Sequence, residues 1–160
     1  MSLDDLRAPA DRDLPALLAL NNAHAAELSL LDHHALQRLL AASCRARVIG
    51  SVAAFIVAFD ETSDYASPNY RWFRSRHRRF VYVDRVCVSP EMRGRGLARR
   101  LYDDVFAAAR AAGHKRIVCE VNRDPPNPGS DAFHAALGFA EAGTGAGGGG
   151  RVVRYLERAL

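Results

Sequence analysis

The stretch VYVDRVCVSPEMRGRGLARRLYDDVFAAAR, residues 81–110, decides the fold. Residues 81–88 predict a β-strand, since they form a β-branched and aromatic run that a Ser-Pro pair ends. Leucines and small apolar residues then recur at helical spacing from Leu97 until Gly113 can cap a helix. The sequence therefore predicts a strand, a turn at residues 93–98, and a helix.

The turn has a composition that suits an anion. Gly94, Gly96 and Ala98 leave the backbone bare where the strand gives way to the helix. Several N–H groups can therefore converge at the positive end of the helix dipole. The surrounding arginines are Arg93, Arg95, Arg99 and Arg100. A phosphate or diphosphate is the expected ligand.

Spacing separates the phosphate-binding patterns that could apply to this turn. A P-loop needs Gly-Lys-Ser/Thr, but Lys115 is the only lysine in the chain. The dinucleotide pattern G-x-G-x-x-G begins with Gly94 and Gly96 and then has Arg99 in place of its third glycine. The pattern R-x-x-G-x-A after V-x-P-x-x-R remains, and it resembles motif A of the GCN5-related N-acetyltransferases, the GNAT superfamily.

A second motif strengthens the resemblance. The family often has N-x-x-A-x-x-L-Y-x-x-x-G-F after its fifth strand, and residues 127–139 read NPGSDAFHAALGF, with His134 in the place of the usual tyrosine. The resemblance implies an α/β (α+β) GNAT acyl-CoA acyltransferase fold. Its mixed, mostly antiparallel sheet of six to seven strands is splayed between strands 4 and 5 and flanked by about four helices. Residues 1–160 would form one GNAT domain.

The remaining chain supplies a compatible order of elements. Strands are expected at 3–8, 45–49, 52–59, 116–121, 139–142 and 151–157, and helices at 13–25, from 32, and at 130–137. Residues 60–76 predict a long connection rich in aromatics and arginines. The glycine-rich residues 143–150 predict a mobile tip without a ligand role.

Bulk properties narrow the class of protein. With 160 residues, 49% of them hydrophobic, and a net charge of +4, the chain can bury its own core. Cys44, Cys87 and Cys119 lie in apolar runs and predict buried thiols in a reducing compartment, without zinc spacing. An acidic start and the lack of a long apolar run predict a cytoplasmic protein without a membrane segment.

No metal site is predicted. The histidines outside the second motif show no metal-ligand spacing and are expected on the surface: His24, His33, His34 and His114.

The resemblance implies transfer of an acetyl group from acetyl-CoA to a primary amine of a small molecule, an amino acid or a peptide N-terminus, by direct attack in a ternary complex. The turn would hold the diphosphate, the fourth strand would pair with the pantetheine arm, and Arg99, Arg100 or Arg123 would meet the 3′-phosphate. The implied coenzyme A residues are Val86, Cys87, Val88, Arg93, Gly94, Arg95, Gly96, Leu97, Ala98, Arg99, Asn127 and His134.

Three residues are candidates for catalysis. Asp84 is the first choice for the base, since it shares a strand face with Val88, although an ion pair with a neighbouring arginine explains it equally well. Glu120 on the next strand is the reserve. In the family the tyrosine replaced by His134 protonates the departing CoA thiolate, and an imidazolium could do the same, or the ring could only donate a hydrogen bond or pack. A covalent role for Cys87 is disfavoured, because a buried strand cysteine is usually inert.

The sequence does not identify the acceptor substrate. The resemblance places Glu27 and Ser29 in a loop bordering the acceptor pocket, and the aromatic connection adds Tyr70 and Trp72, although polar surface is an alternative for each. Its arginines mildly favour acceptors with an acid group. Two further hypotheses are a catalytically silent acyl-CoA-binding or regulatory domain, and a nucleic-acid binder using residues 71–79, which is the less favoured of the two. A homodimer is left open.

Overall fold

The computed structural model describes all residues from 1 to 160. Its strands are β1 Leu6–Arg7, β2 Arg45–Ile49, β3 Ala54–Asp60, β4 Val81–Val88, β5 Arg116–Asp124, β6 Ala140–Ala146 and β7 Val152–Ala159. Its α-helices are α1 Leu14–Ala23, α2 His33–Ala42, α3 Pro68–Arg74, α4 Leu97–Ala111 and α5 Pro128–Ala136. The short 3-10 turns are η1 Asp11–Asp13, η2 Pro90–Met92 and η3 Gly148–Gly150.

The strands form one mixed sheet in the order β1-β2-β3-β4-β5-β7-β6. Antiparallel pairing joins β1 to β2, β2 to β3, β5 to β7 and β6 to β7. The pairing of β4 with β5 is parallel, and its register joins Val81 to Ile117 and Tyr82 to Val118. The predicted fold class is confirmed, including the splay between the fourth and fifth strands.

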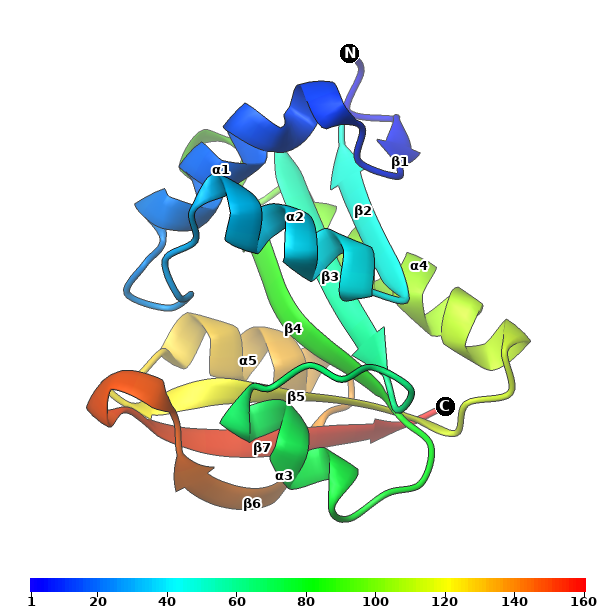
Figure 1. The fold of residues 1–160 in the computed structure, drawn as a ribbon, viewed down its shortest axis with the longest axis vertical. Coiled ribbons are helices and arrows are strands. Elements are labelled where there is room, and N and C mark those ends of the chain that lie inside the picture. Colours follow the sequence, from blue (N-terminus) through cyan, green and yellow to red (C-terminus); the bar gives the residue numbers. More distant parts are fainter. The chain divides into compact units, whose positions relative to one another are not determined.

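The chain divides into two compact units. Unit 1 comprises residues 1–59 and 85–105, and unit 2 comprises residues 60–84 and 106–160. In unit 1, α1 and α2 pack on one another (Figure 1), and the largest buried side chains include Leu17, Leu36, Phe55, Ile56, Phe59 and Tyr102. In unit 2, β7 lies between β5 and β6 (Figure 1), and the buried aromatics include Tyr70, Phe73, Phe80, Tyr82 and Tyr155.

Several predicted element boundaries hold and others need adjustment. β2 and β4 match the prediction, and Asp32 caps α2 by accepting a hydrogen bond from the Ala35 N–H at 2.7 Å. The first strand is shorter than predicted, spanning only Leu6–Arg7. Asp13 precedes α1 but makes no side-chain cap, because its carboxylate binds Arg7 and the Ala10 N–H instead.

The prediction of an irregular connection over residues 60–76 was wrong in part, because this segment contains α3. Pro68 occupies the first turn, where its missing N–H costs nothing. Tyr70 and Phe73, three residues apart, then share one helix face and are both fully buried. Burial of two aromatic side chains, at about 1.5–3 kcal/mol each, stabilises a helix that would be too short to form alone.

The prediction of a mobile tip over residues 143–150 was also wrong in part. β6 continues through Gly143 and Gly145 to Ala146, paired with β7 throughout. No helix combines the length and apolarity needed to cross a bilayer.

Candidate functional site

The turn before α4 has the geometry that an anion site requires. Gly94 and Gly96 have φ of 77° and 73°, in the left-handed region that favours glycine, and both are exposed. The Gly96 carbonyl accepts the first helical hydrogen bond, from the Arg100 N–H at 3.1 Å. The N–H groups of residues 97–99 lie in the first helical turn, where no preceding carbonyl can serve them. The turn therefore presents unused donors at the positive end of the α4 dipole.

The arginines around the turn have different partners. Arg100 donates to the carbonyl oxygens of Leu3 and Asp4, at 2.6 and 3.3 Å, and so tethers the N-terminal segment. Arg93 donates to Nε2 of His24 at 3.2 Å. Arg95 and Arg99 are exposed. Of the arginines predicted for the 3′-phosphate, Arg100 is thus the one already occupied, while Arg99 and Arg123 both extend into solvent.

Residues along the second half of β4 alternate between half-buried and buried, as the predicted shared face of Asp84 and Val88 requires. Asp84, Val86 and Val88 are half-buried, whereas Arg85 and Cys87 between them are buried. Period-two geometry therefore puts the first three on one strand face. Burial raises the pKa of the Cys87 thiol to about 11, which Arg93 offsets only in part. Cys87 is consequently a protonated thiol at neutral pH and a poor nucleophile.

Two asparagines at the end of α1 hold the loop that contains Glu27 and Ser29. Asn21, fully buried, donates to the Ser29 carbonyl at 2.9 Å and accepts from Arg85 at 2.7 Å. Arg85 also reaches the Ser29 hydroxyl at 3.2 Å. Asn22 exchanges two hydrogen bonds with the Leu31 backbone, at 2.9 and 3.0 Å. Glu27 itself is exposed.

Glu120 belongs to a hydrogen-bond network within unit 2. Its Oε1 accepts from the Tyr82 hydroxyl at 2.9 Å and from Asn69 Nδ2 at 3.0 Å. The Tyr155 hydroxyl donates to Asn69 Oδ1 at 3.1 Å, which fixes the orientation of that amide. Burial, with the nearby charges of Glu120 and Asp84, holds the pKa of Tyr82 well above its usual value. Tyr82 therefore remains a donor to Glu120.

His134 lies on α5, whose start is capped by Asn127 accepting from the Ser130 N–H at 3.3 Å. The imidazole is buried, with Nδ1 2.8 Å from the Ser130 carbonyl oxygen. Burial lowers the pKa of His134, an effect that the Ser130 hydrogen bond and the Asp131 charge oppose in part.

The two aromatic residues predicted to contact the acceptor have structural partners. Tyr70 is fully buried, and its hydroxyl donates to the carbonyl oxygens of Asp60 and Ser63 at 2.7 and 3.0 Å. Trp72 stacks on Tyr155, and the guanidinium of Arg76 lies 3.6 Å from the Trp72 ring centroid. Both rings therefore stabilise unit 2.

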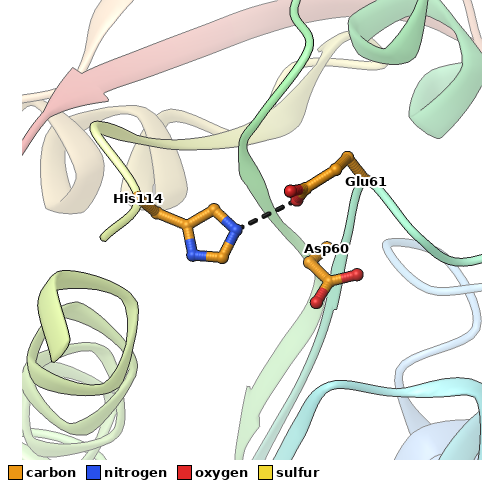
Figure 2. A group of neighbouring side chains, drawn as sticks. All are labelled: Asp60, Glu61 and His114. Carbon is orange, nitrogen blue, oxygen red and sulfur yellow. Dashed lines mark hydrogen bonds and ion pairs between the residues drawn. The ribbon is translucent and has the colours of Figure 1, made fainter. Parts of the chain in front are cut away.

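The prediction that His114 lies on the surface was wrong. His114 is buried, and its Nε2 is 3.0 Å from Oε2 of Glu61, as Figure 2 shows. Asp60 completes a trio with ligand types that suit a divalent cation. The other Glu61 oxygen, however, already pairs with Arg79 at 3.2 Å. Burial alone would raise the pKa of Glu61, but a backbone hydrogen bond, His114 and Arg79 together lower it, as expected of an ion-paired cluster.

A cavity of about 620 Å³ in unit 1 contains none of the residues predicted for coenzyme A. It is lined by residues 8–11, the end of α2 and the start of β2, and Cys44 opens into it. Cys44 is exposed, so the prediction that all three cysteines are buried holds only for Cys87 and Cys119.

Sequence reasoning gave no site role to Asn21 or Asn69, the residues that contact Arg85 and Glu120. The available signal for Asn21 was an Asn-Asn pair at the end of an apolar helix. A buried polar side chain must have hydrogen-bond partners, so such a pair indicates contacts to other segments. No local pattern marks Asn69, which lies 51 residues from Glu120 in sequence.

The turn before α4 has left-handed glycines, an exposed backbone and flanking arginines, which are the features expected of a phosphate-binding turn. The second motif adds a capped helix that carries a buried imidazole. Together they define an acyl-CoA-dependent transferase.

Comparison with known proteins identifies the family. The sequence profile described as the Acetyltransferase (GNAT) family matches residues 7–139. The chain is 27% identical over 159 residues to phosphinothricin N-acetyltransferase of Alcaligenes faecalis, covering 97% of this chain and 79% of the relative. It therefore belongs to the GNAT family, whose members are N-acetyltransferases that use acetyl-CoA.

Solved structures share the fold. Ribosomal-protein-alanine N-acetyltransferase from Brucella melitensis superposes with a TM-score of 0.73 at 22% identity, covering 98% of this chain and 99% of that one. The protein yncA from Salmonella typhimurium, solved with acetyl-CoA, gives a TM-score of 0.70 at 19% identity, covering 98% and 93%.

Proposed function

We propose that the chain, acting as one acetyltransferase domain, transfers the acetyl group of acetyl-CoA to a primary amine by direct attack in a ternary complex. The acceptor class is a small molecule, an amino acid or a peptide N-terminus. The observation that carries the proposal is the exposed turn with left-handed Gly94 and Gly96 ahead of the first turn of α4. Such a turn has the backbone conformation and the exposure that suit the diphosphate of coenzyme A.

The turn before α4 and the end of β4 would bind the cofactor. The amides of residues 94–99 would bind the diphosphate, and Arg95 and Arg99 would add charge. Val86 and Val88, half-buried at the end of β4, would pair with the amides of pantetheine. A backbone N–H of the same strand end would stabilise the oxyanion of the tetrahedral intermediate.

The acceptor amine also needs a base. We assign the base to Glu120, whose carboxylate Tyr82 and Asn69 hold in one orientation, and keep Asp84 as the alternative. An aliphatic ammonium cannot attack until it loses a proton, which Glu120 would take and pass to solvent. The second proton of the amine must reach the sulfur of CoA.

Direct attack is preferred to an acetylated enzyme intermediate. The only thiol among the proposed coenzyme A residues is Cys87, and its pKa of about 11 makes the thiolate scarce at neutral pH. A base that activates the amine leaves no task for an enzyme nucleophile.

The test is release of CoA from acetyl-CoA across a panel of amines: phosphinothricin, free amino acids, and short peptides with free N-termini. We expect turnover with at least one, and a loss of about 10²-fold or more in kcat for Glu120→Gln. Asp84→Asn is the matched variant, and a larger loss there would move the base to Asp84. Tight binding of acetyl-CoA without turnover on any amine would instead favour a silent acyl-CoA-binding domain.

A further inference from the structure

The cavity of unit 1 has the size of a small-molecule site. Its volume of about 620 Å³ falls within the roughly 300–1,000 Å³ that is typical of ligand pockets. Its lining belongs to unit 1 alone and comprises residues 8–11 and Leu14, the second half of α2, and residues 43–47. A ligand bound there would therefore contact none of the residues assigned to coenzyme A.

The backbone of Ala46 faces this cavity. In the pairing of β1 with β2, the Gly50 N–H donates to the Asp5 carbonyl at 2.9 Å. Alternate residues of an antiparallel strand direct their N–H and C=O groups toward the same neighbour, so Val48 and Ala46 also face the β1 side. β1 ends at Arg7, opposite Val48, and no strand lies beside Ala46 on that side. The Ala46 N–H is therefore an edge donor at the cavity wall.

Pro9 explains why the sheet edge opens at this point. The register of β1 on β2 would put Pro9 opposite Ala46, but proline has no N–H to give to the Ala46 carbonyl. Nη1 of Arg47 donates to that carbonyl instead, at 2.9 Å. The segment after β1 is held by the Asp13 carboxylate, which accepts from the Ala10 N–H at 2.7 Å. The gap beside Ala46 is thus built into the fold.

The β2 wall of the cavity has an excess of positive charge. Arg45 donates two hydrogen bonds of 2.8 Å to Asp104, and Nε of Arg47 lies 3.5 Å from the same carboxylate. Two guanidinium groups share one carboxylate, so one positive charge is left over. An anion that accepts from the Ala46 N–H would lie beside the Arg47 guanidinium, and a carboxylate matches the planar geometry of such donors.

The remaining walls are mostly apolar. Their short aliphatic side chains are those of Ala8, Pro9, Ala10, Leu14, Leu40 and Ala41. Asp11 is the acid among the lining residues, and it is exposed at the start of η1. Its charge would repel a second carboxylate on a ligand and attract an ammonium group.

We propose that this cavity binds a small monocarboxylate with a short aliphatic body. The carboxylate accepts from the Ala46 N–H and the Arg47 guanidinium, and the aliphatic body packs on Leu14 and Leu40. Aliphatic amino acids and short branched carboxylic acids share this chemistry, and an amino acid would add a contact between its ammonium group and Asp11. The proposal goes beyond the proposed function and does not depend on it.

Cys44 supplies the reporter for the test. It lines the cavity and is exposed, whereas Cys87 and Cys119 are buried, so the neutral disulfide 4,4′-dithiodipyridine should react with Cys44 first. We expect 4-methylpentanoate or leucine to slow this reaction by about 5-fold or more, with half-protection at about 1 mM or below. Neutral 4-methylpentanamide should bind about 10-fold more weakly, because it lacks the charge.

The two carboxylates distinguish the possible sources of the ligand. Stronger protection by leucine, lost in Asp11→Asn, would identify an amino acid, and stronger protection by 4-methylpentanoate would identify a carboxylic acid without an amino group. Lack of protection by both at about 10 mM, or equal protection by the amide, would overturn the site.

Opposite charges at position 37 give a matched pair of variants. Gln37 is exposed on α2 and lines the cavity, so neither Gln37→Glu nor Gln37→Lys should impair folding. Gln37→Glu should weaken 4-methylpentanoate by about 3-fold or more, and Gln37→Lys should keep or raise the affinity. Arg47→Gln should weaken it by about 10-fold. Unchanged affinity in both Gln37→Glu and Arg47→Gln, or the reverse order of the two variants at position 37, would contradict the proposal.

Discussion

Trp72 on α3 stacks on Tyr155 of β7, with ring centroids 4.1 Å apart and an interplanar angle of 20°. Two glycines of β6 lie against these rings. A Cβ added at Gly143 would come within 2.7 Å of Trp72, and one at Gly145 within 2.7 Å of Tyr155. The rings occupy the space of the missing side chains, so glycine at these two positions is a packing requirement.

Gly143→Val should therefore destabilise the protein. The valine must push the Trp72 ring off Tyr155, a form of overpacking that costs about 1–3 kcal/mol. Urea unfolding measures the change in the free energy of unfolding. Gly148→Ala is the control, because an added Cβ there meets nothing within 4 Å. Equal stability of both variants would show that the stacked pair tolerates a side chain.

The same region shows what the sequence could not predict. A glycine-rich run from residue 143 to 150 indicates a loop by composition, yet its first part pairs as β6 because aromatics from elsewhere in unit 2 cover the bare strand. α3 was missed for a similar reason, since its two buried aromatics stabilise it only through packing. Elements whose signal is local, such as β4 and the capped start of α2, were predicted correctly.

Gly96→Ala should weaken acetyl-CoA binding more than it weakens the fold. A Cβ at Gly96 meets no protein atom within 4 Å, but the left-handed φ of 73° strains any other residue and the methyl group would face the diphosphate. We expect a loss of about 10-fold or more in affinity, measured by calorimetry.

Gly113→Ala is the matched control for that prediction. Gly113 caps α4 with φ of 82°, so alanine meets the same backbone strain, of about 1 kcal/mol, outside the diphosphate turn. Its affinity for acetyl-CoA should stay within about 2-fold of the unsubstituted protein. If both variants lost affinity alike, general destabilisation would explain the effect and the turn would lose its assigned role.

In the candidate site, as in the fold, features that depend on consecutive residues could be predicted and long-range contacts could not. The glycine turn before α4 and the helix that carries His134 could be predicted because each belongs to a pattern of consecutive residues. The partners that orient Arg85 and Glu120 were not found, because Asn21 is 64 residues from the first and Asn69 is 51 residues from the second. Contacts over such separations follow from tertiary structure and leave no periodic signal in the chain.

Cys87→Ala should retain kcat within about 3-fold. The thiol is buried with a pKa of about 11, so it is not a nucleophile at neutral pH, and direct attack does not need it. Iodoacetamide at pH 7.5 should modify the exposed Cys44 and leave Cys87 unmodified in the folded protein, as peptide mass spectrometry can show. An acetyl group found on Cys87 after rapid quenching with acetyl-CoA would contradict direct attack.

Asp13→Asn should remove a pH-dependent part of the stability. The Asp13 carboxylate accepts from Arg7 at 2.6 and 2.8 Å and from the Ala10 N–H at 2.7 Å, and these interactions outweigh burial and lower the pKa from 3.8 to about 2. Because the pKa is lower in the folded state, the stabilisation is complete above about pH 4 and disappears as the pH falls toward 2. At neutral pH we expect a cost of about 1–3 kcal/mol.

The measurement is the free energy of unfolding in urea for both proteins between pH 2 and pH 7. The difference between them should be constant from neutral pH down to about pH 4 and then shrink, since protonated Asp13 resembles asparagine in charge. Asp11→Asn is the control: Asp11 is exposed at the start of the same turn, so its loss should change stability by less than about 0.5 kcal/mol. A difference that persisted undiminished at pH 2 would show that the shape of the Asp13 carboxylate, and not its charge, holds Arg7.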